Sequence, residues 1–318
     1  MRALRFTRFG PPRDVLTVAD VTDPDIGGGE ALVAVKAASV NPSDLKNVTG
    51  DMEGTVLPRI PGRDFAGVVV GGPRDWLGAE VYGTGGDVGF TRDGTHAELI
   101  GVPSAALVRK PERLSFAEAA VLGVPFVVGW LGAVETALLE KGETIAIFGV
   151  GGGVGSAVAQ IARVRGARII GVDRTAPAGD APVDHFVPLG DDTGAEVRRL
   201  TGGAGADVVY DAVGGVTTPT ALDALAPRGR LIVISAVGTR TVTLDLVDFY
   251  HREARMMGSD SRRLDAVRCA EMLSRFTPYL EAGDFRPPPI ACGFSLEEAA
   301  DAYTAIAGKP RGRVVICP

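Results

Sequence analysis

Ile147-Phe-Gly-Val-Gly-Gly-Gly-Val-Gly-Ser156 is the stretch that decides the fold of this chain. It continues a short apolar run that starts at Thr144, and it opens a helical pattern that we expect over 153–164. A strand, a glycine-rich turn and a helix in this order are typical of a dinucleotide phosphate loop. Glycines let the backbone approach a pyrophosphate, and the helix N-terminus offers it N–H groups. We therefore expect a dinucleotide-binding loop that includes Gly151, Gly152, Gly153 and Val154.

The alternation of short strands and helices continues on the C-terminal side of this loop. Short apolar runs predict strands at 167–172, 207–210 and 229–235, and helical patterns lie around 195–200 and 217–225. Strands that are apolar throughout and that alternate with helices indicate a parallel, doubly wound α/β sheet of the Rossmann type.

An acidic residue, Asp173, ends the strand that follows the loop, roughly 20 residues beyond it. A carboxylate at this place accepts hydrogen bonds from the adenine ribose hydroxyls and repels a 2′-phosphate, which favours NADH. Arg174 follows immediately and offers two alternatives: it could bind a 2′-phosphate, or it could be a solvated surface cation.

The first third of the chain is β-rich, with strand patterns at 31–40 and 65–70. A helical pattern runs from Ser115 to Leu139, and Ser115 with Glu118 forms a capping box at its start. The last strand pattern is 313–317. We therefore expect the doubly wound domain, residues 121–258, to be inserted in a β-rich catalytic domain made of residues 1–120 and 259–318.

Composition narrows the possible partners. The chain has 318 residues, 33 Lys+Arg against 39 Asp+Glu, and a net charge of -6, which argues against a nucleic-acid partner. No stretch is apolar enough for a membrane span, and the first residues predict a strand rather than a signal peptide, so we expect a cytoplasmic protein. The three cysteines form no CxxC pair, which excludes a structural zinc lobe.

Several motifs occur in a characteristic order: Asn41-Pro-Ser-Asp44, Pro61-Gly-Arg-Asp-Phe-Ala-Gly67, the glycine loop, Asp211-Ala-Val-Gly-Gly215 and Gly312-Arg-Val-Val-Ile316. Together they resemble the zinc-independent quinone oxidoreductase branch of the medium-chain dehydrogenase/reductases. The resemblance implies a GroES-like catalytic domain around the Rossmann domain, with the active site in the cleft between them. It also implies an NAD(P)H-dependent oxidoreductase that transfers hydride to a small-molecule substrate, a quinone or an activated alkene. A homodimer through the edge of the dinucleotide domain is implied as well.

The resemblance also bears on metal binding. The zinc-dependent relatives have a cysteine, a histidine and a second cysteine where this chain has Asn41, Arg63 and Val124. An amide, a guanidinium and an isopropyl group are not zinc ligands, so we expect no catalytic metal. Hydrogen-bond donors must then polarise the substrate carbonyl. We expect Arg63 to be an ion-pair partner of Asp64.

Ser43 and Lys46 match positions of the proton relay in those relatives, and they are the candidate catalytic residues. Lys46 could donate a proton or stabilise an enolate, or it could be a solvated loop lysine. The resemblance places Asn41 at the nicotinamide ribose and puts Val128 where the family often has a threonine. Further cofactor contacts are expected at Val213, Ser235, Ala236 and Val237.

The chain departs from the family after Arg174. Residues 175–183 are too rich in Pro and Gly for the helix expected there, and they lack the lysine that often binds a 2′-phosphate. Leu189 stands where a tyrosine often assists that lysine. Both departures favour NADH. Two rival readings remain: a non-catalytic dinucleotide sensor or structural protein on the same fold, and a zinc enzyme with unusual ligands. Loops such as 83–95 and 250–262 are expected to form the pocket walls.

Overall fold

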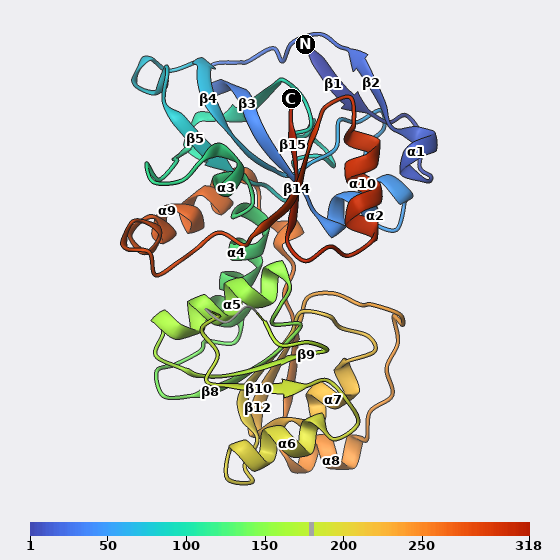
Figure 1. Ribbon diagram of the computed structural model, residues 1–318, viewed down its shortest axis with the longest axis vertical. Coiled ribbons are helices and arrows are strands. Elements are labelled where there is room, and N and C mark those ends of the chain that lie inside the picture. The colour runs from blue at the N-terminus through green and yellow to red at the C-terminus, as the bar shows by residue number, and fades with distance from the viewer. Residues whose placement is uncertain (178–180) are drawn as a thin grey trace. The chain divides into compact units, whose positions relative to one another are not determined.

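A computed structural model describes residues 1–177 and 181–318 of the protein (Figure 1). The chain divides into two compact units, each with its own core. Unit 1 contains Met1–Val127 and Ser261–Pro318, and unit 2 contains Val128–Asp260. The domain boundaries at 120/121 and 258/259 that we drew from the sequence stay a prediction.

Unit 2 is built on a six-stranded parallel sheet. Its strands are β8 (Thr144–Phe148), β9 (Arg168–Asp173), β10 (His185–Pro188), β11 (Ala206–Asp211), β12 (Leu225–Val233) and β13 (Arg255–Gly258). They lie in the order β10-β9-β8-β11-β12-β13, with β8 and β11 side by side in the middle. The chain winds outward from β8 in one direction and then from β11 in the other, which is the doubly wound order of dinucleotide-binding domains.

Helices cover both faces of this sheet. They are α5 (Gly153–Val164), α6 (Thr193–Leu200), α7 (Thr218–Asp223) and α8 (Leu246–His251). Figure 1 shows α5 on one face and α6 and α7 on the other. The side chains of β8 alternate accordingly: Ile145 and Ile147 pack with α5, whereas Ala146 and Phe148 pack with α6 and α7. The predicted helix at 153–164 is confirmed residue for residue.

Unit 1 is β-rich, as predicted. Its main sheet has seven strands in the order β14-β15-β3-β4-β5-β7, with β6 also paired to β3, and β1 and β2 form a separate ribbon. The strands are β1 (Arg2–Arg5), β2 (Thr17–Asp20), β3 (Glu30–Val40), β4 (Asp64–Gly71), β5 (Glu80–Gly83), β6 (Leu99–Pro103), β7 (Val108–Arg109), β14 (Ile290–Ser295) and β15 (Arg313–Cys317). The predicted α/β fold class, with a doubly wound parallel sheet in one unit and a β-rich second unit, is therefore confirmed.

The helices of unit 1 are α1 (Pro12–Val15), α2 (Pro42–Thr49), α3 (Phe116–Ala120), α9 (Ala266–Ala282) and α10 (Ala299–Ala307), with short 3-10 turns η1 (Arg74–Trp76), η2 (Ser104–Ala106) and η4 (Ser261–Arg263). Two registers place the site residues of this unit. Val314 of β15 pairs with Val40 of β3, and Ser39 of β3 pairs with Asp64 of β4. The start of β15, the end of β3 and the start of β4 are therefore adjacent.

The single helix predicted from Ser115 to Leu139 is wrong. Its capping box is confirmed, since the Ser115 hydroxyl accepts the Glu118 N–H and the Glu118 carboxylate accepts the Ser115 N–H. However, the chain forms α3, then α4 (Gly123–Trp130), then the π-helical segment η3 (Leu131–Thr136). Pro125 cannot donate a hydrogen bond to the Val121 carbonyl. At Gly123 the chain passes so close to Asp64 that a Cβ would lie 2.4 Å from a carboxylate oxygen.

The predicted absence of a helix over 175–183 falls partly on residues 178–180, which lie outside the described residues. On either side of them, residues 175–177 and 181–183 form no helix. In the described part of the chain, no helix combines the length and the apolar character needed to cross a bilayer.

Candidate functional site

The loop between β8 and α5 can be formed only by glycine at two positions. Gly149 has φ +79°, and a Cβ on Gly155 would lie 2.1 Å from the Gly149 carbonyl oxygen. Gly152 caps α5, and the first intrahelical bond comes from the Ser156 N–H to the Gly152 carbonyl. The N–H groups of Gly153, Val154 and Gly155 thus belong to the free, electropositive end of a three-turn helix, which suits a pyrophosphate.

Asp173 lies directly beside this loop, at the end of β9. One carboxylate oxygen accepts the Gly151 N–H at 3.0 Å, and the other accepts the Arg174 N–H at 2.7 Å. The carboxylate is only partly buried, so its remaining lone pairs can accept ribose hydroxyls. The Arg174 residue is exposed. The Leu189 N–H donates to the Asp173 carbonyl, and its side chain packs against the core.

Asp211, at the end of β11, organises the next loop. It is fully buried, and one of its oxygens accepts the N–H groups of Val213 and Gly214 at 3.2 and 2.8 Å. The same oxygen accepts the Thr217 hydroxyl, and the second oxygen accepts the Thr218 hydroxyl. The sequence analysis assigned no role to Asp211. The available signal was an acidic residue placed between the apolar strand at 207–210 and the Gly-Gly pair at 214–215.

The loops after β8, β11 and β12 touch one another. A Cβ on Gly149 would lie 2.9 Å from the Val213 side chain, and a Cβ on Gly214 would lie 1.7 Å from the Ser235 carbonyl oxygen. An isolated β-bridge joins Gly215 to Val237. A pocket of about 260 Å³ opens at the ends of β12 and β13, lined among others by Ser235, Ala236 and Arg240. The structure therefore brings the predicted cofactor residues of these loops together at the carboxyl edge of the sheet.

Val128 stands where the family often has a threonine, and its side chain has no hydroxyl to offer a cofactor. It is 8% exposed, and its carbonyl accepts the buried Tyr210 hydroxyl at 2.9 Å. A dinucleotide requires a glycine-rich loop, a free helix N-terminus and an adjacent carboxylate. The loop between β8 and α5, the start of α5 and Asp173 provide them, so the residues present fit that cofactor.

In unit 1, Asn41 and Asp44 form a reciprocal capping box at the start of α2. The Asn41 side chain is buried, and both ends of its amide are bonded. Its nitrogen donates to Asp64 at 3.1 Å, and its oxygen accepts a hydrogen bond from Arg313. The role of Asn41 at the nicotinamide ribose stays a prediction.

The candidate catalytic side chains lie on α2. Ser43 and Lys46 are three residues apart, so they share one face of the helix. The Ser43 hydroxyl oxygen is buried and has no hydrogen-bond partner among the described residues. Lys46 is half-buried, in the last turn of α2. A buried hydroxyl and a partly shielded ammonium on one face could pass a proton to a substrate oxygen or carbon.

We predicted an ion pair between Arg63 and Asp64, and this prediction is wrong for the described residues. In the described chain its guanidinium donates to the Gly85 carbonyl at 2.9 Å and lies 3.4 Å from the Ser261 hydroxyl. Asp64 instead accepts the Asn41 amide and the Val124 N–H, the latter at 2.9 Å. Two of the three positions that hold zinc ligands in zinc-dependent relatives, Asn41 and Val124, therefore donate to one carboxylate. Among residues 1–177 and 181–318, no group of three His, Cys, Asp or Glu could hold a metal.

Burial governs the ionisation of this cluster. Desolvation raises the pKa of Asp44 to about 7 and raises the pKa of Asp64, and it lowers the pKa of the buried Arg313 guanidinium. His96 is nearby in the network, with its ring nitrogens 3.2 Å from the Ser39 carbonyl and 3.1 Å from the Tyr303 hydroxyl. Burial lowers its pKa to about 4, so this ring is neutral at physiological pH.

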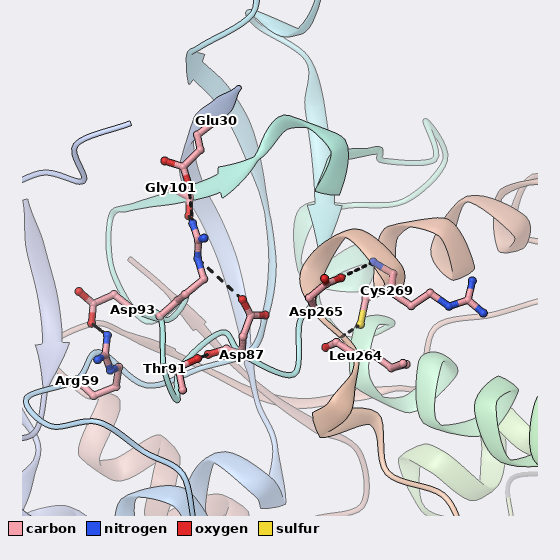
Figure 2. Close-up of polar contacts among 11 residues, drawn as sticks. Glu30, Arg59, Asp87, Thr91, Asp93, Gly101, Leu264, Asp265 and Cys269 are labelled. Atoms are coloured by element: carbon pink, nitrogen blue, oxygen red, sulfur yellow. Dashed lines mark hydrogen bonds and ion pairs between the residues drawn. The ribbon is translucent and has the colours of Figure 1, made fainter. Parts of the chain in front are cut away.

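A loop that includes Asp87–Asp93 is fixed next to α2. The Asn47 side chain donates to the Gly89 carbonyl at 2.8 Å. Two ion pairs anchor the loop. Arg92 binds Glu30 at 2.7 Å. Arg59 binds Asp93 at 2.9 Å, a pair that Figure 2 labels. Part of the expected pocket wall at 83–95 is thus a rigid neighbour of the helix that carries Ser43 and Lys46.

Two protein families match this chain. Residues 27–112 match the family of the alcohol dehydrogenase GroES-like domain, and residues 153–277 match the family described as zinc-binding dehydrogenase. The two matches correspond to the β-rich sheet of unit 1 and to the region that starts at α5.

Among curated proteins, a zinc-type alcohol dehydrogenase-like protein of Schizosaccharomyces pombe is 38% identical over 90% of this chain and 87% of its own length. The 2-methylene-furan-3-one reductase of Solanum lycopersicum is 30% identical over 100% of this chain and 79% of its own. A quinone oxidoreductase of Pongo abelii is 27% identical, covering 96% and 94%.

Two solved structures of dehydrogenase and quinone oxidoreductase proteins also superpose on this chain. An NAD-dependent alcohol dehydrogenase superposes with a TM-score of 0.89 at 30% identity and covers 100% of both chains. A quinone oxidoreductase of Pseudomonas syringae superposes with a TM-score of 0.87 at 26% identity, covering 100% and 99%.

Asp44→Asn tests the ionisation of the buried cluster. Because the pKa of Asp44 is raised, folded Asp44 keeps its proton between about pH 4 and 7, where the unfolded chain loses it. Stability of the wild type therefore falls as pH rises through this window, by up to about 1.4 kcal/mol per pH unit. Asn41 keeps an acceptor in Asp44→Asn, so the variant should gain stability relative to the wild type from pH 5 to 7.

Unfolding midpoints measured across this pH range check the result. Asp75→Asn, which changes an exposed carboxyl in the same unit, is the matched control and should follow the wild type. A pH-independent difference between Asp44→Asn and the wild type would contradict the prediction.

Proposed function

The chain belongs to the medium-chain dehydrogenase/reductase superfamily, and on this premise we propose that it is a zinc-independent reductase that uses NADH. Its substrate is a quinone or an activated alkene. The observation that carries the proposal is the convergence of three glycine-dependent loops beside Asp173 at the carboxyl edge of the parallel sheet.

When bound, the reduced nicotinamide supplies the hydride, which goes to an electrophilic carbon of the substrate. The chain's own groups bind the dinucleotide and orient it. N–H groups at the start of α5 hold the pyrophosphate, Asp173 accepts the adenine ribose hydroxyls, and the backbone of 235–237 contacts the nicotinamide. Most of the rate acceleration then comes from positioning and from polarising the substrate carbonyl.

The preference for NADH rests on charge. The Asp173 carboxylate would lie against a 2′-phosphate, and both of its oxygens are fixed by backbone N–H groups, so it cannot easily turn away. Leu189 offers no hydrogen bond to a phosphate from its side chain. Arg174 is the competing group, because its exposed guanidinium could neutralise that phosphate.

Zinc independence rests on donor chemistry. Asn41 and Arg63 are already hydrogen-bonded within unit 1, and Val124 has no donor atom in its side chain. Polarisation of the substrate carbonyl then falls to Lys46, with Ser43 beside it on α2. As hydride reaches the electrophilic carbon, the substrate gains one negative charge, and a proton from Lys46 neutralises it. Solvent reprotonates the lysine.

The substrate class follows from the names of the relatives and from the absence of zinc ligands. A quinone and a methylene-furanone both contain a C=C bond conjugated to a carbonyl, so both accept hydride at carbon and a proton elsewhere. Oxidation of a simple alcohol without a Lewis acid fits the site less well.

We also propose a cytoplasmic homodimer. Strand β13 is the outermost strand of the six-stranded sheet, and it pairs with β12 on one side only in the described chain. A second copy could continue the sheet at this edge.

Turnover with a metal control tests the proposal. We expect oxidation of NADH by a simple quinone or enone, with substoichiometric zinc by elemental analysis and full activity after chelation. Stoichiometric zinc with loss of activity on chelation would indicate a zinc enzyme with unusual ligands. Dinucleotide binding without turnover of any quinone or enone would indicate the non-catalytic sensor.

Lys46→Met tests the proton donor. Removal of the ammonium should lower kcat about 10²-fold or more, the usual range for general acid catalysis, with little change in NADH affinity. Lys36→Met, which changes an exposed lysine on β3, is the control. An unchanged kcat for Lys46→Met would identify Lys46 as a solvated surface residue.

A further inference from the structure

Arg313, the first residue of β15, is a buried cation with two directed contacts. It is 7% exposed, and the same terminal nitrogen donates to the Ser39 hydroxyl at 2.8 Å and to the Asn41 amide oxygen. A buried guanidinium is costly unless nearby groups compensate its charge. The compensating groups here are the buried carboxyl groups of Asp64 and, above the pH at which it ionises, Asp44.

From Arg313 a chain of hydrogen bonds runs to the start of α2. The Asn41 amide that accepts from Arg313 also donates to Asp64, and Asp64 accepts the Val124 N–H. The Asn41 backbone N–H donates to Asp44 at 2.8 Å, which closes the first turn of α2. Three segments that are distant in the sequence, namely β15, β4 and the start of α4, are thereby tied to the helix end that follows β3.

The helix that begins there carries the candidate catalytic side chains, Ser43 in its first turn and Lys46 in its last. Ser43 is two residues after Asn41, and Lys46 follows one turn later. Any rotation of the Asn41 amide would break its bond to Arg313 or to Asp64, because one end of the amide accepts and the other donates. The orientation of the first turn of α2 is therefore set by a residue near the other end of the chain.

We propose that Arg313 is a positioning residue, which fixes Asn41 and through it places Ser43 and Lys46 for proton delivery; this inference rests on the proposed function of those two side chains. A lysine at 313 would keep the charge but offers an ammonium on a flexible stem instead of a planar fork. It would therefore hold the contacts to Ser39 and Asn41 less firmly.

Kinetics of Arg313→Lys, alone and combined with Ser43→Ala or Lys46→Met, test the inference. We expect Arg313→Lys to lower kcat about tenfold, the effect of one hydrogen bond to a charged group, and to leave the Kd of NADH within about twofold. In the Ser43→Ala and Lys46→Met backgrounds the same change should lower kcat no further, because the group that it positions is already lost. A full tenfold fall in both backgrounds would show that Arg313 acts independently of α2, and would overturn the inference.

Two further variants and one measurement complete the test. Arg275→Lys changes an exposed arginine on α9 of the same unit and should match the wild type. Ser39→Ala removes one anchor of the guanidinium without changing charge, and it should lower kcat in the same direction as Arg313→Lys. It serves as the test if Arg313→Lys does not fold.

Amide hydrogen exchange separates this inference from the proposed function, because it needs no turnover. Residues 43–48 should exchange faster in Arg313→Lys than in the wild type, while α5 is unchanged. If the wild type reduces no quinone or enone, the proposed function fails, and exchange still decides whether Arg313 orders α2. Unchanged exchange together with unchanged kcat would overturn the positioning role.

Discussion

Close backbone approach at the carboxyl edge of one parallel sheet is the constraint on which the rest of unit 2 depends. At Gly155 a side-chain carbon would lie 2.1 Å from the Gly149 carbonyl oxygen of the same loop, and at Gly214 it would lie 1.7 Å from the Ser235 carbonyl oxygen of the neighbouring loop, distances that no non-bonded atom pair tolerates. Glycine at these points lets the loops after β8, β11 and β12 touch, and the buried carboxylate of Asp211 gathers the N–H and hydroxyl groups of one of them. The result is an edge where backbone donors are preorganised, which suits an anionic cofactor that must be bound mainly by main-chain groups.

Unit 1 follows a different principle, in which buried charges balance one another. Two carboxylates, Asp44 and Asp64, lie with the guanidinium groups of Arg63 and Arg313 around the start of α2, and all four are at most 7% exposed. Breaking one member of such a cluster leaves an uncompensated buried charge, so the cluster resists partial change.

Local patterns predicted the local elements well. The helix at 153–164 and the Ser115 capping box follow from residues within a few positions of one another, and both are confirmed. What the sequence could not reveal depends on partners that are distant along the chain. The break before α4 reflects a contact with Asp64, 60 positions away, and the bond between Arg313 and Asn41 spans 272 positions. For the same reason Arg63 looked like an ion-pair partner of Asp64, although tertiary hydrogen bonds direct its guanidinium to Gly85 and Ser261.

The central claim is that the loops of unit 2 bind a dinucleotide and that Asp173 selects NADH. Parallel fluorescence titrations of the wild-type protein with NADH and NADPH at one fixed salt concentration test it most directly. The account predicts NADH binding at least about tenfold tighter, a difference of about 1.4 kcal/mol. Tighter binding of NADPH would show that Arg174 outweighs Asp173, and binding of neither dinucleotide would contradict the account at its foundation.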